Sequence, residues 1–276
     1  MSEQGWDIRL EKMCVGYGST VVLSDIDALF PAGRISVILG GSGCGKSTLL
    51  RHIAGLSRPL SGRTLIGGRD LFALPPKEFR RLRRHMGMLF QDGALLGALT
   101  LEQNVALPLT EHTRLPQEII SAAALRCLAL VGLQDFGAYF PAQLSGGMRK
   151  RAGLARALIT EPRILLCDEP TSGLDPINAA RMDQLLLDMK AHYTEMSLIV
   201  VSHDLASLAR IADRILVLRD GGAVFQGSYT DLSAVDDVYL QCFLQRQSAE
   251  DEHDQADGAG LPDPEVRAAL HKWLDK

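Results

Sequence analysis

The sequence of 276 residues lacks any apolar run long enough to cross a membrane as a helix. A transmembrane helix needs about 20 mainly apolar residues, whereas the longest candidate, residues 122–133, is interrupted by Arg126. The N-terminus also lacks the basic and then apolar pattern of a secretory signal. We therefore expect any work at a membrane to require another chain.

Clustered cysteines and an excess of basic residues are also missing. The five cysteines are widely separated, without a Cys-x-x-Cys pair or a Cys/His cluster, so the sequence indicates neither a zinc site nor a disulfide framework. The net charge of −4 gives no global basic field, and we predict no nucleic-acid partner. Segment 80–84 carries four arginines, which favours a solvated helix face over an anionic partner because it is short.

A glycine-rich run follows the short apolar segment 35–39 and precedes a helical pattern over residues 47–54. In such a loop, glycines let successive backbone N–H groups surround phosphate oxygens, and the helix N-terminus faces the same charge. Lys46 would supply a positive charge for the β- and γ-phosphates, and the Ser47 hydroxyl would bind Mg²⁺. The predicted nucleotide-binding residues are Gly40, Gly41, Ser42, Gly43, Cys44, Gly45, Lys46, Ser47 and Thr48.

A second apolar run, residues 164–167, ends in two acids. Asp168 could hold the hydration shell of Mg²⁺, and Glu169 could polarise the attacking water as a general base. Many strands end in an acidic turn, so this pattern is weak by itself, but the segment 170–175 that follows strengthens it.

The remaining patterns predict an α/β fold class. Alternating stretches over residues 8–30, with a turn at 16–18, indicate antiparallel strands. Buried runs at 164–167 and 198–201 are typical of a parallel sheet. Residues 92–141 have a helical pattern broken at three positions and predict a helical subdomain; the breaks are at Pro108, Pro116 and Gly132.

The segment Leu144-Ser145-Gly146-Gly147-Met148 completes a resemblance. With it, residues 6–233 resemble the nucleotide-binding subunit of an ATP-binding cassette (ABC) transporter. The resemblance implies a P-loop NTPase fold with a RecA-like parallel-sheet core, an N-terminal antiparallel β subdomain and an inserted α-helical subdomain. It also implies ATP and Mg²⁺ as cofactors and a second copy of the chain as partner, because this segment acts on nucleotide bound to the other copy. Small residues allow close approach there, and the helix dipole favours anionic charge.

Four more positions match the family, which usually has Gln at Met148, a departure that leaves the serine and glycines intact. Tyr17 resembles the aromatic that stacks on adenine, the alternative being a tyrosine on a β surface. Gln91 resembles the glutamine that touches Mg²⁺ or water, Asp175 an aspartate at the dimer interface, and His203 a histidine that contacts the γ-phosphate. The predicted catalytic residues are Lys46, Gln91, Glu169 and His203, and the predicted metal site comprises Ser47, Gln91 and Asp168.

Segments 90–109 and 168–177 resemble the ATPase subunits of Mla/Mce-type phospholipid transporters. That resemblance implies permease subunits, an MCE-domain protein and a STAS-domain protein as partners, and a position on the cytoplasmic face of the inner membrane. Residues 94–101 would line the groove for a permease coupling helix, or else belong to the core of the helical subdomain. The core motifs also allow a small-solute importer or a lipoprotein-release motor. A third alternative is a scaffold cassette without productive hydrolysis, against which the intact Lys46, Asp168, Glu169 and His203 argue.

The last part of the chain has a different character. Residues 249–260 carry five acids and no Lys or Arg, which predicts a flexible linker. A short helix is expected from Asp263, with an apolar face that packs on the second ATPase subunit or folds back on its own. The predicted division is an ATPase domain over 6–233, with a helical subdomain at about 92–145, and a C-terminal extension over 234–276. The apolar face comprises Val266, Ala269, Leu270, Trp273 and Leu274.

Overall fold

The computed structural model describes residues 6–203, 212–237 and 240–241. The chain divides into two compact units, Met1–Ala234 and Val235–Lys276, and all labelled helices and strands belong to the first unit. The acidic linker and the amphipathic helix predicted for residues 249–274 lie outside the described residues.

A six-stranded sheet forms the centre of the first unit, in the order β10-β9-β3-β8-β7-β6. Its neighbouring strands are parallel except for β9 and β10, which are antiparallel. Every residue of β3, β7 and β8 is buried, which explains their continuous apolar sequences. The predicted α/β class with a parallel core is therefore confirmed. The strands are β3 (Ile35–Leu39), β6 (Met86–Leu89), β7 (Ile164–Asp168), β8 (Ser197–Ser202), β9 (Arg214–Arg219) and β10 (Gly222–Gly227).

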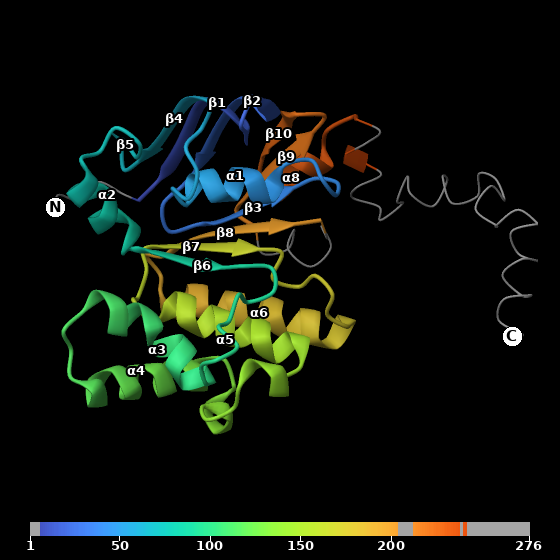
Figure 1. The fold of residues 1–276 in the computed structure, drawn as a ribbon. Helices are drawn as coiled ribbons and strands as arrows, with labels where there is room; N and C mark the ends of the chain where they lie inside the picture. The colour runs from blue at the N-terminus through green and yellow to red at the C-terminus, as the bar shows by residue number, and fades with distance from the viewer. Residues whose placement is uncertain (1–5, 204–211, 238–239, 242–276) are drawn as a thin grey trace, which may run out of the picture. The chain divides into compact units, whose positions relative to one another are not determined.

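A second, four-stranded sheet has the order β2-β1-β4-β5 and is antiparallel throughout. Helix α1 (Lys46–Ile53) lies between the two sheets, and its buried leucines join one apolar core with residues of both (Figure 1). The turn predicted at 16–18 comes later, because Tyr17 still pairs with Thr20. The strands are β1 (Ile8–Tyr17), β2 (Thr20–Phe30), β4 (Ser61–Ile66) and β5 (Arg69–Asp70).

Helices α5 (Gly146–Leu158) and α6 (Pro176–His192) cover the face of the six-stranded sheet opposite α1, and α3 (Leu101–His112) and α4 (Gln117–Leu130) lie beyond them (Figure 1). Helix α4 packs against both α3 and α5. The short helices are α2 (Pro76–Arg83), η1 (Gln134–Phe136), η2 (Pro141–Gln143) and α8 (Tyr229–Ser233). Within the described ranges, no helix combines the length and apolarity that a membrane span requires.

The structure confirms two of the three predicted breaks in the helical segment. Pro116 precedes α4, and Gly132, with a φ of 68°, follows its end. The break at Pro108 is wrong, because α3 continues through this residue. A proline inside a helix removes one backbone hydrogen bond. The start of α3 is fixed by a capping box in which Thr100 and Gln103 bond each other's backbone N–H groups.

Candidate nucleotide site

The glycine-rich loop joins the end of β3 to the start of α1, at the edge where parallel strands end. Gly45, with a φ of 99°, directly precedes α1. A Cβ atom at this position would lie 2.8 Å from Val22 Cγ1 and 2.9 Å from Leu23 Cγ. The backbone conformation and the close packing therefore both require glycine at position 45.

Lys46 places its ammonium group inside this loop. Its side chain is 4% exposed, and Nζ donates hydrogen bonds of 2.8 Å to the carbonyl oxygens of Gly40 and Gly41. The same Nζ lies 4.0 Å from Glu169 Oε1. The ammonium thus stands where a phosphate bound by the loop would meet it. Ser42, Gly43 and Cys44 complete the loop, and burial raises the pKa of the Cys44 thiol.

Ser47 joins the loop to the end of β7. Its hydroxyl donates a hydrogen bond of 2.7 Å to Asp168 Oδ1. A hydroxyl and a carboxylate are the hard oxygen donors that Mg²⁺ accepts, with nucleotide phosphates and water as its remaining ligands. The described residues contain no group of three or more His, Cys, Asp or Glu that could hold a metal alone. The two donors therefore fit a Mg²⁺ that arrives with a nucleotide.

Burial raises the pKa of Asp168, and the hydrogen bond from Ser47 partly opposes this rise. The folded chain then holds the proton more tightly than the unfolded chain, whose reference value is 3.8. The ionised carboxylate costs stability at neutral pH, and this cost disappears as the pH falls through the raised pKa toward 3.8.

We therefore expect Asp168→Asn to raise the melting temperature of the nucleotide-free protein at neutral pH by about 2 °C. Asparagine removes the buried charge and can still accept the hydrogen bond from Ser47. Scanning calorimetry from pH 4 to pH 8 should show the difference shrinking as the pH falls. The variant should also lose the extra stabilisation that MgATP gives the wild type, whereas equal or lower stability at neutral pH would contradict the prediction.

Glu169 follows β7 and points its carboxylate toward two other predicted residues. Its Oε2 lies 3.2 Å from His203 Nδ1, and its Oε1 faces Lys46 at 4.0 Å. The side chain of Glu169 is 17% exposed, so water can reach it. Lys46, Glu169 and His203, which come from three separate chain segments, therefore lie close together. A carboxylate held beside a lysine and a histidine can accept a proton from water.

Tyr17 and Thr48 meet at the other side of the loop. The Tyr17 hydroxyl lies 3.0 Å from Thr48 Oγ1, and the Tyr17 side chain is mostly exposed. An exposed ring beside the first turn of α1 can stack on a planar base. Gln91 follows the end of β6 and is exposed, and no hydrogen bond among the described residues joins its side chain to Ser47 or Asp168.

Ser145 is the N-cap of helix α5, and its Oγ accepts a hydrogen bond of 3.3 Å from Met148 N. Gly146 and Gly147 follow in the first turn. A Cβ atom at Gly147 would meet Leu174 Cδ2 at 3.6 Å, an ordinary contact. Packing among the described residues therefore does not require glycine at 147.

Asp175 begins helix α6 next to this turn. Its Oδ1 accepts hydrogen bonds from the backbone N–H groups of Ile177 and Asn178, at 3.1 and 3.0 Å. These bonds, chiefly those from Asn178, lower the pKa of Asp175. The residue thus caps α6 within its own chain, a role that the sequence did not predict.

The sequence interpretation missed two cations on α5. Lys150 is 5% exposed and donates to the carbonyl oxygen of Glu169 at 3.0 Å. Arg156 donates to Gly93 O and Ala94 O, at 2.8 and 2.7 Å, just after Gln91. A signal for Lys150 exists, because it shares the buried face of α5 with Leu154 and Leu158 at helical spacing.

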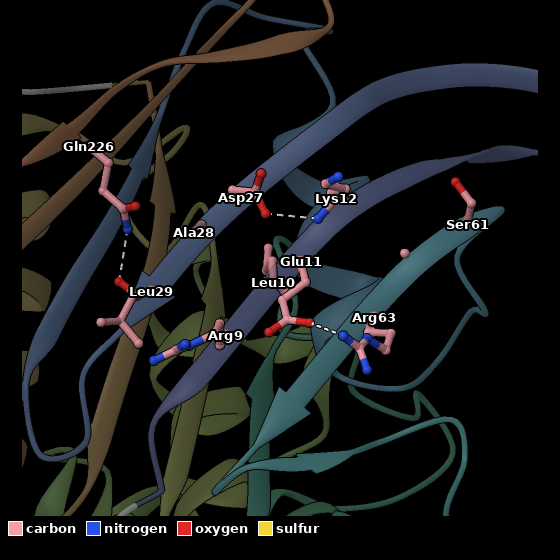
Figure 2. Close-up of a pocket in the computed structure, with 11 residues that line it drawn as sticks. Arg9, Leu10, Glu11, Lys12, Asp27, Ala28, Leu29, Ser61, Arg63 and Gln226 are labelled. Atoms are coloured by element: carbon pink, nitrogen blue, oxygen red, sulfur yellow. Dashed lines mark hydrogen bonds and ion pairs between the residues drawn. The ribbon is translucent and has the colours of Figure 1, made fainter.

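A hollow of about 880 Å³ lies on the four-stranded sheet, and none of the predicted nucleotide residues lines it. Most of its polar groups pair with each other (Figure 2). Glu11 binds Arg63 at 2.6 Å, and Gln226 Nε2 donates to Leu29 O at 2.8 Å. The hollow is therefore separate from the candidate site.

Comparison with known proteins agrees with this geometry. The family model described as "ABC transporter" matches residues 23–172. The chain is 40% identical over 240 residues to the probable ribonucleotide transport ATP-binding protein mkl of Mycobacterium tuberculosis, covering 87% of this chain and 67% of that protein. It is 39% identical over 246 residues to the methionine import ATP-binding protein MetN 2 of Pseudomonas syringae, covering 84% and 71%.

Two further likenesses bear on the function. The intermembrane phospholipid transport system ATP-binding protein MlaF of Haemophilus influenzae is 36% identical over 241 residues, covering 87% of this chain and 91% of that protein. The solved structure of the ATP-binding cassette MJ0796, a dimer in a post-hydrolysis state bound to ADP and Pi, has a TM-score of 0.73 and 32% identity. The match covers 80% of this chain and 98% of the MJ0796 chain.

The two-sheet fold, the glycine-rich loop and the acids that end β7 define an ATP-hydrolysing cassette. The chain belongs to the ABC transporter family and is an ATP-binding subunit of such a transporter. The predicted resemblance to Mla/Mce-type ATPases is confirmed by MlaF and mkl among its relatives. ABC cassettes work as dimers with membrane permease subunits.

Proposed function

We propose that this chain is the ATPase subunit of an Mla/Mce-type phospholipid transporter, acting as a dimer on the cytoplasmic face of the inner membrane. Its partners are a second copy, permease subunits, an MCE-domain protein and a STAS-domain protein. The observation that carries the proposal is the likeness to MlaF, a phospholipid transport protein, along 91% of that protein's length.

In the proposed mechanism, two copies close on two ATP molecules. Lys46 and His203 of one copy hold the γ-phosphate, while Ser145 and Gly147 of the other approach it from the opposite side. Glu169 accepts a proton from the attacking water. Ser47 and Asp168 would hold Mg²⁺, with Gln91 approaching on closure, and the ion would supply positive charge to the phosphates.

In the closed dimer, Tyr17 stacks on the adenine ring, and Asp175 lies at the interface between the copies. Because each site needs groups from both copies, an isolated subunit should hydrolyse ATP slowly. Closure moves the helical segment, and with it the permease.

The segment after Gln91 supports the link to the permease. The buried side chain of Asn104 accepts a hydrogen bond of 2.7 Å from Leu96 N and donates to three carbonyl oxygens of the same turn. These carbonyls belong to Leu96, Leu99 and Thr100, at 3.0–3.1 Å. The turn is thereby fixed with the Leu96 side chain 48% exposed. A rigid loop with an exposed leucine suits a groove that binds a helix. The partial burial of Leu95 and Leu99 instead suits the alternative, in which these residues belong to the core of the helical subdomain.

Mass spectrometry of proteins and lipids that co-purify with Glu169→Gln in detergent and MgATP tests the proposal. We expect a permease, an MCE-domain protein and enriched phospholipid. A solute-type permease with a periplasmic binding protein, and no enriched lipid, would overturn the phospholipid assignment in favour of an importer, as MetN represents.

Two leucine variants sharpen the same experiment. Leu96→Glu should abolish co-purification of the permease without loss of folding, because it puts a charge on the exposed turn. Leu115→Glu is the matched control, since Leu115 is 45% exposed in the connection between α3 and α4. Equal recovery of permease with both variants would remove the groove from the proposal.

A further inference from the structure

The backbone of Glu169 has an unusual conformation. Its φ is 47°, in the left-handed region that side-chain-bearing residues seldom adopt. Such a conformation persists only where the surrounding structure determines it by several contacts. On one side, Glu169 N donates a hydrogen bond of 3.0 Å to Val201 O in β8. The conformation also decides where the carboxylate points.

The carbonyl oxygen of Glu169 is held by two side chains. It accepts hydrogen bonds from Lys150 Nζ at 3.0 Å and from Ser172 Oγ at 3.1 Å. Lys150 Nζ also reaches Ser172 O at 2.5 Å and Ser172 Oγ at 3.0 Å. One ammonium group thus joins both ends of the turn from Glu169 to Ser172.

Lys150 is a buried cation that forms no salt bridge with a carboxylate of the described residues. Burial lowers the pKa of Lys150, while the charges of Asp92 and Glu169 act in the opposite direction. Its position on α5, in line with Leu154 and Leu158, would otherwise suit an apolar side chain. Burying an ammonium group costs free energy unless its N–H donors are hydrogen-bonded. The carbonyl groups that Lys150 binds therefore explain why a lysine is tolerated at this position.

The helix that carries Lys150 also carries the segment predicted to meet the second copy. Lys150 lies four residues after Gly146, about one helical turn. Helix α5 packs against β6, on the sheet face opposite α1 (Figure 1). In the proposed dimer, the helix whose first turn approaches one nucleotide is therefore bonded, through Lys150 one turn later, to the base that serves the other.

We propose that Lys150 is a positioning residue for ATP hydrolysis: it fixes the backbone of Glu169 and ties the direction of its carboxylate to helix α5. This inference rests on the proposed role of Glu169 as general base. Lys150 itself touches neither nucleotide nor water in this role, so it acts only through Glu169.

The chain offers a matched control one residue away. Arg151 also lies on α5 and donates to carbonyl oxygens, those of Val131 and Gly132 at 2.8 and 3.3 Å. These carbonyls belong to the end of α4 and not to the turn after β7. Lys150→Met and Arg151→Met therefore remove the same kind of contact from different neighbours.

The first test is steady-state ATP hydrolysis by the full chain with its co-purified permease. Lys150→Met should lower kcat roughly 10- to 100-fold with KM for ATP within about twofold, because the base is displaced and the phosphate site is intact. Arg151→Met should lower the melting temperature but keep kcat within about threefold of wild type. Equal kcat losses in the two variants would overturn the proposal.

A double-mutant cycle with Glu169→Gln gives the decisive readout. Once the base is absent, Lys150→Met should cause no further loss of kcat, since it acts through Glu169. Additive losses would assign Lys150 a purely structural role. If Lys150→Met fails to fold, Ser172→Ala, which removes one hydrogen bond to Glu169 O, should show a smaller loss with the same dependence on Glu169. Full turnover by Glu169→Gln alone would instead refute the role of the base.

Discussion

Replacing Glu169 with glutamine should reduce ATP turnover by roughly 10²- to 10⁴-fold while leaving MgATP binding intact. Glutamine keeps the size of the side chain and its hydrogen-bonding capacity, but it cannot accept a proton from water. The carboxylate that it replaces faces His203 at 3.2 Å and Lys46 at 4.0 Å. Removing this negative charge also relieves repulsion with a bound γ-phosphate, so nucleotide affinity should hold or rise.

Steady-state phosphate release and equilibrium binding of a fluorescent ATP analogue measure the two parts of this prediction. Glu161→Gln is a suitable control, because Glu161 also has a positive φ, 48°, and is exposed after the end of α5. It should retain wild-type turnover. Turnover by Glu169→Gln within about threefold of wild type would reject Glu169 as the base and direct attention to His203.

The parts of the fold that sequence predicts well are those with local causes. The apolar runs of β3, β7 and β8 are continuous because both faces of these strands are buried. The glycine-rich loop is equally easy to predict from the sequence, because few other residues can adopt the backbone conformation of Gly45. In both cases, the burial or the backbone conformation constrains the same residues whose types reveal it in the sequence.

The parts that the sequence could not supply depend on distant partners. Pro108 was predicted to break a helix, but α3 is held by contacts with α4 and α5 that local propensity ignores. The left-handed backbone of Glu169 is likewise set by Lys150 and Val201, from α5 and β8. A single sequence contains these residues but does not show that they are in contact in the folded chain.

Gly147 presents the opposite case, since no contact in the described part of the chain requires glycine there. A Cβ atom there has ordinary contacts with Leu174 and Asn178, at 3.6 Å or more. We therefore expect Gly147→Asp to fold with an unchanged melting temperature and to lose roughly 100-fold in turnover, because it puts a negative charge where the other copy's γ-phosphate would lie. Gly222→Asp is the control and should stay active, because a Cβ atom at this position in β10 would also make an ordinary contact, with Arg219 O at 3.9 Å.

Mixing two inactive variants then tests whether the site is shared between copies. Gly147→Asp keeps an intact Lys46, and Lys46→Met keeps an intact Gly147. In a mixed dimer, one site combines the intact Lys46 of the first with the intact Gly147 of the second, and the other site carries both defects. Equal mixing with free exchange should restore about one quarter of wild-type turnover if the sites act independently, since half of the dimers are mixed. Activity that stays at the level of the separate variants, although mixed dimers form, would exclude an independent site built from two copies.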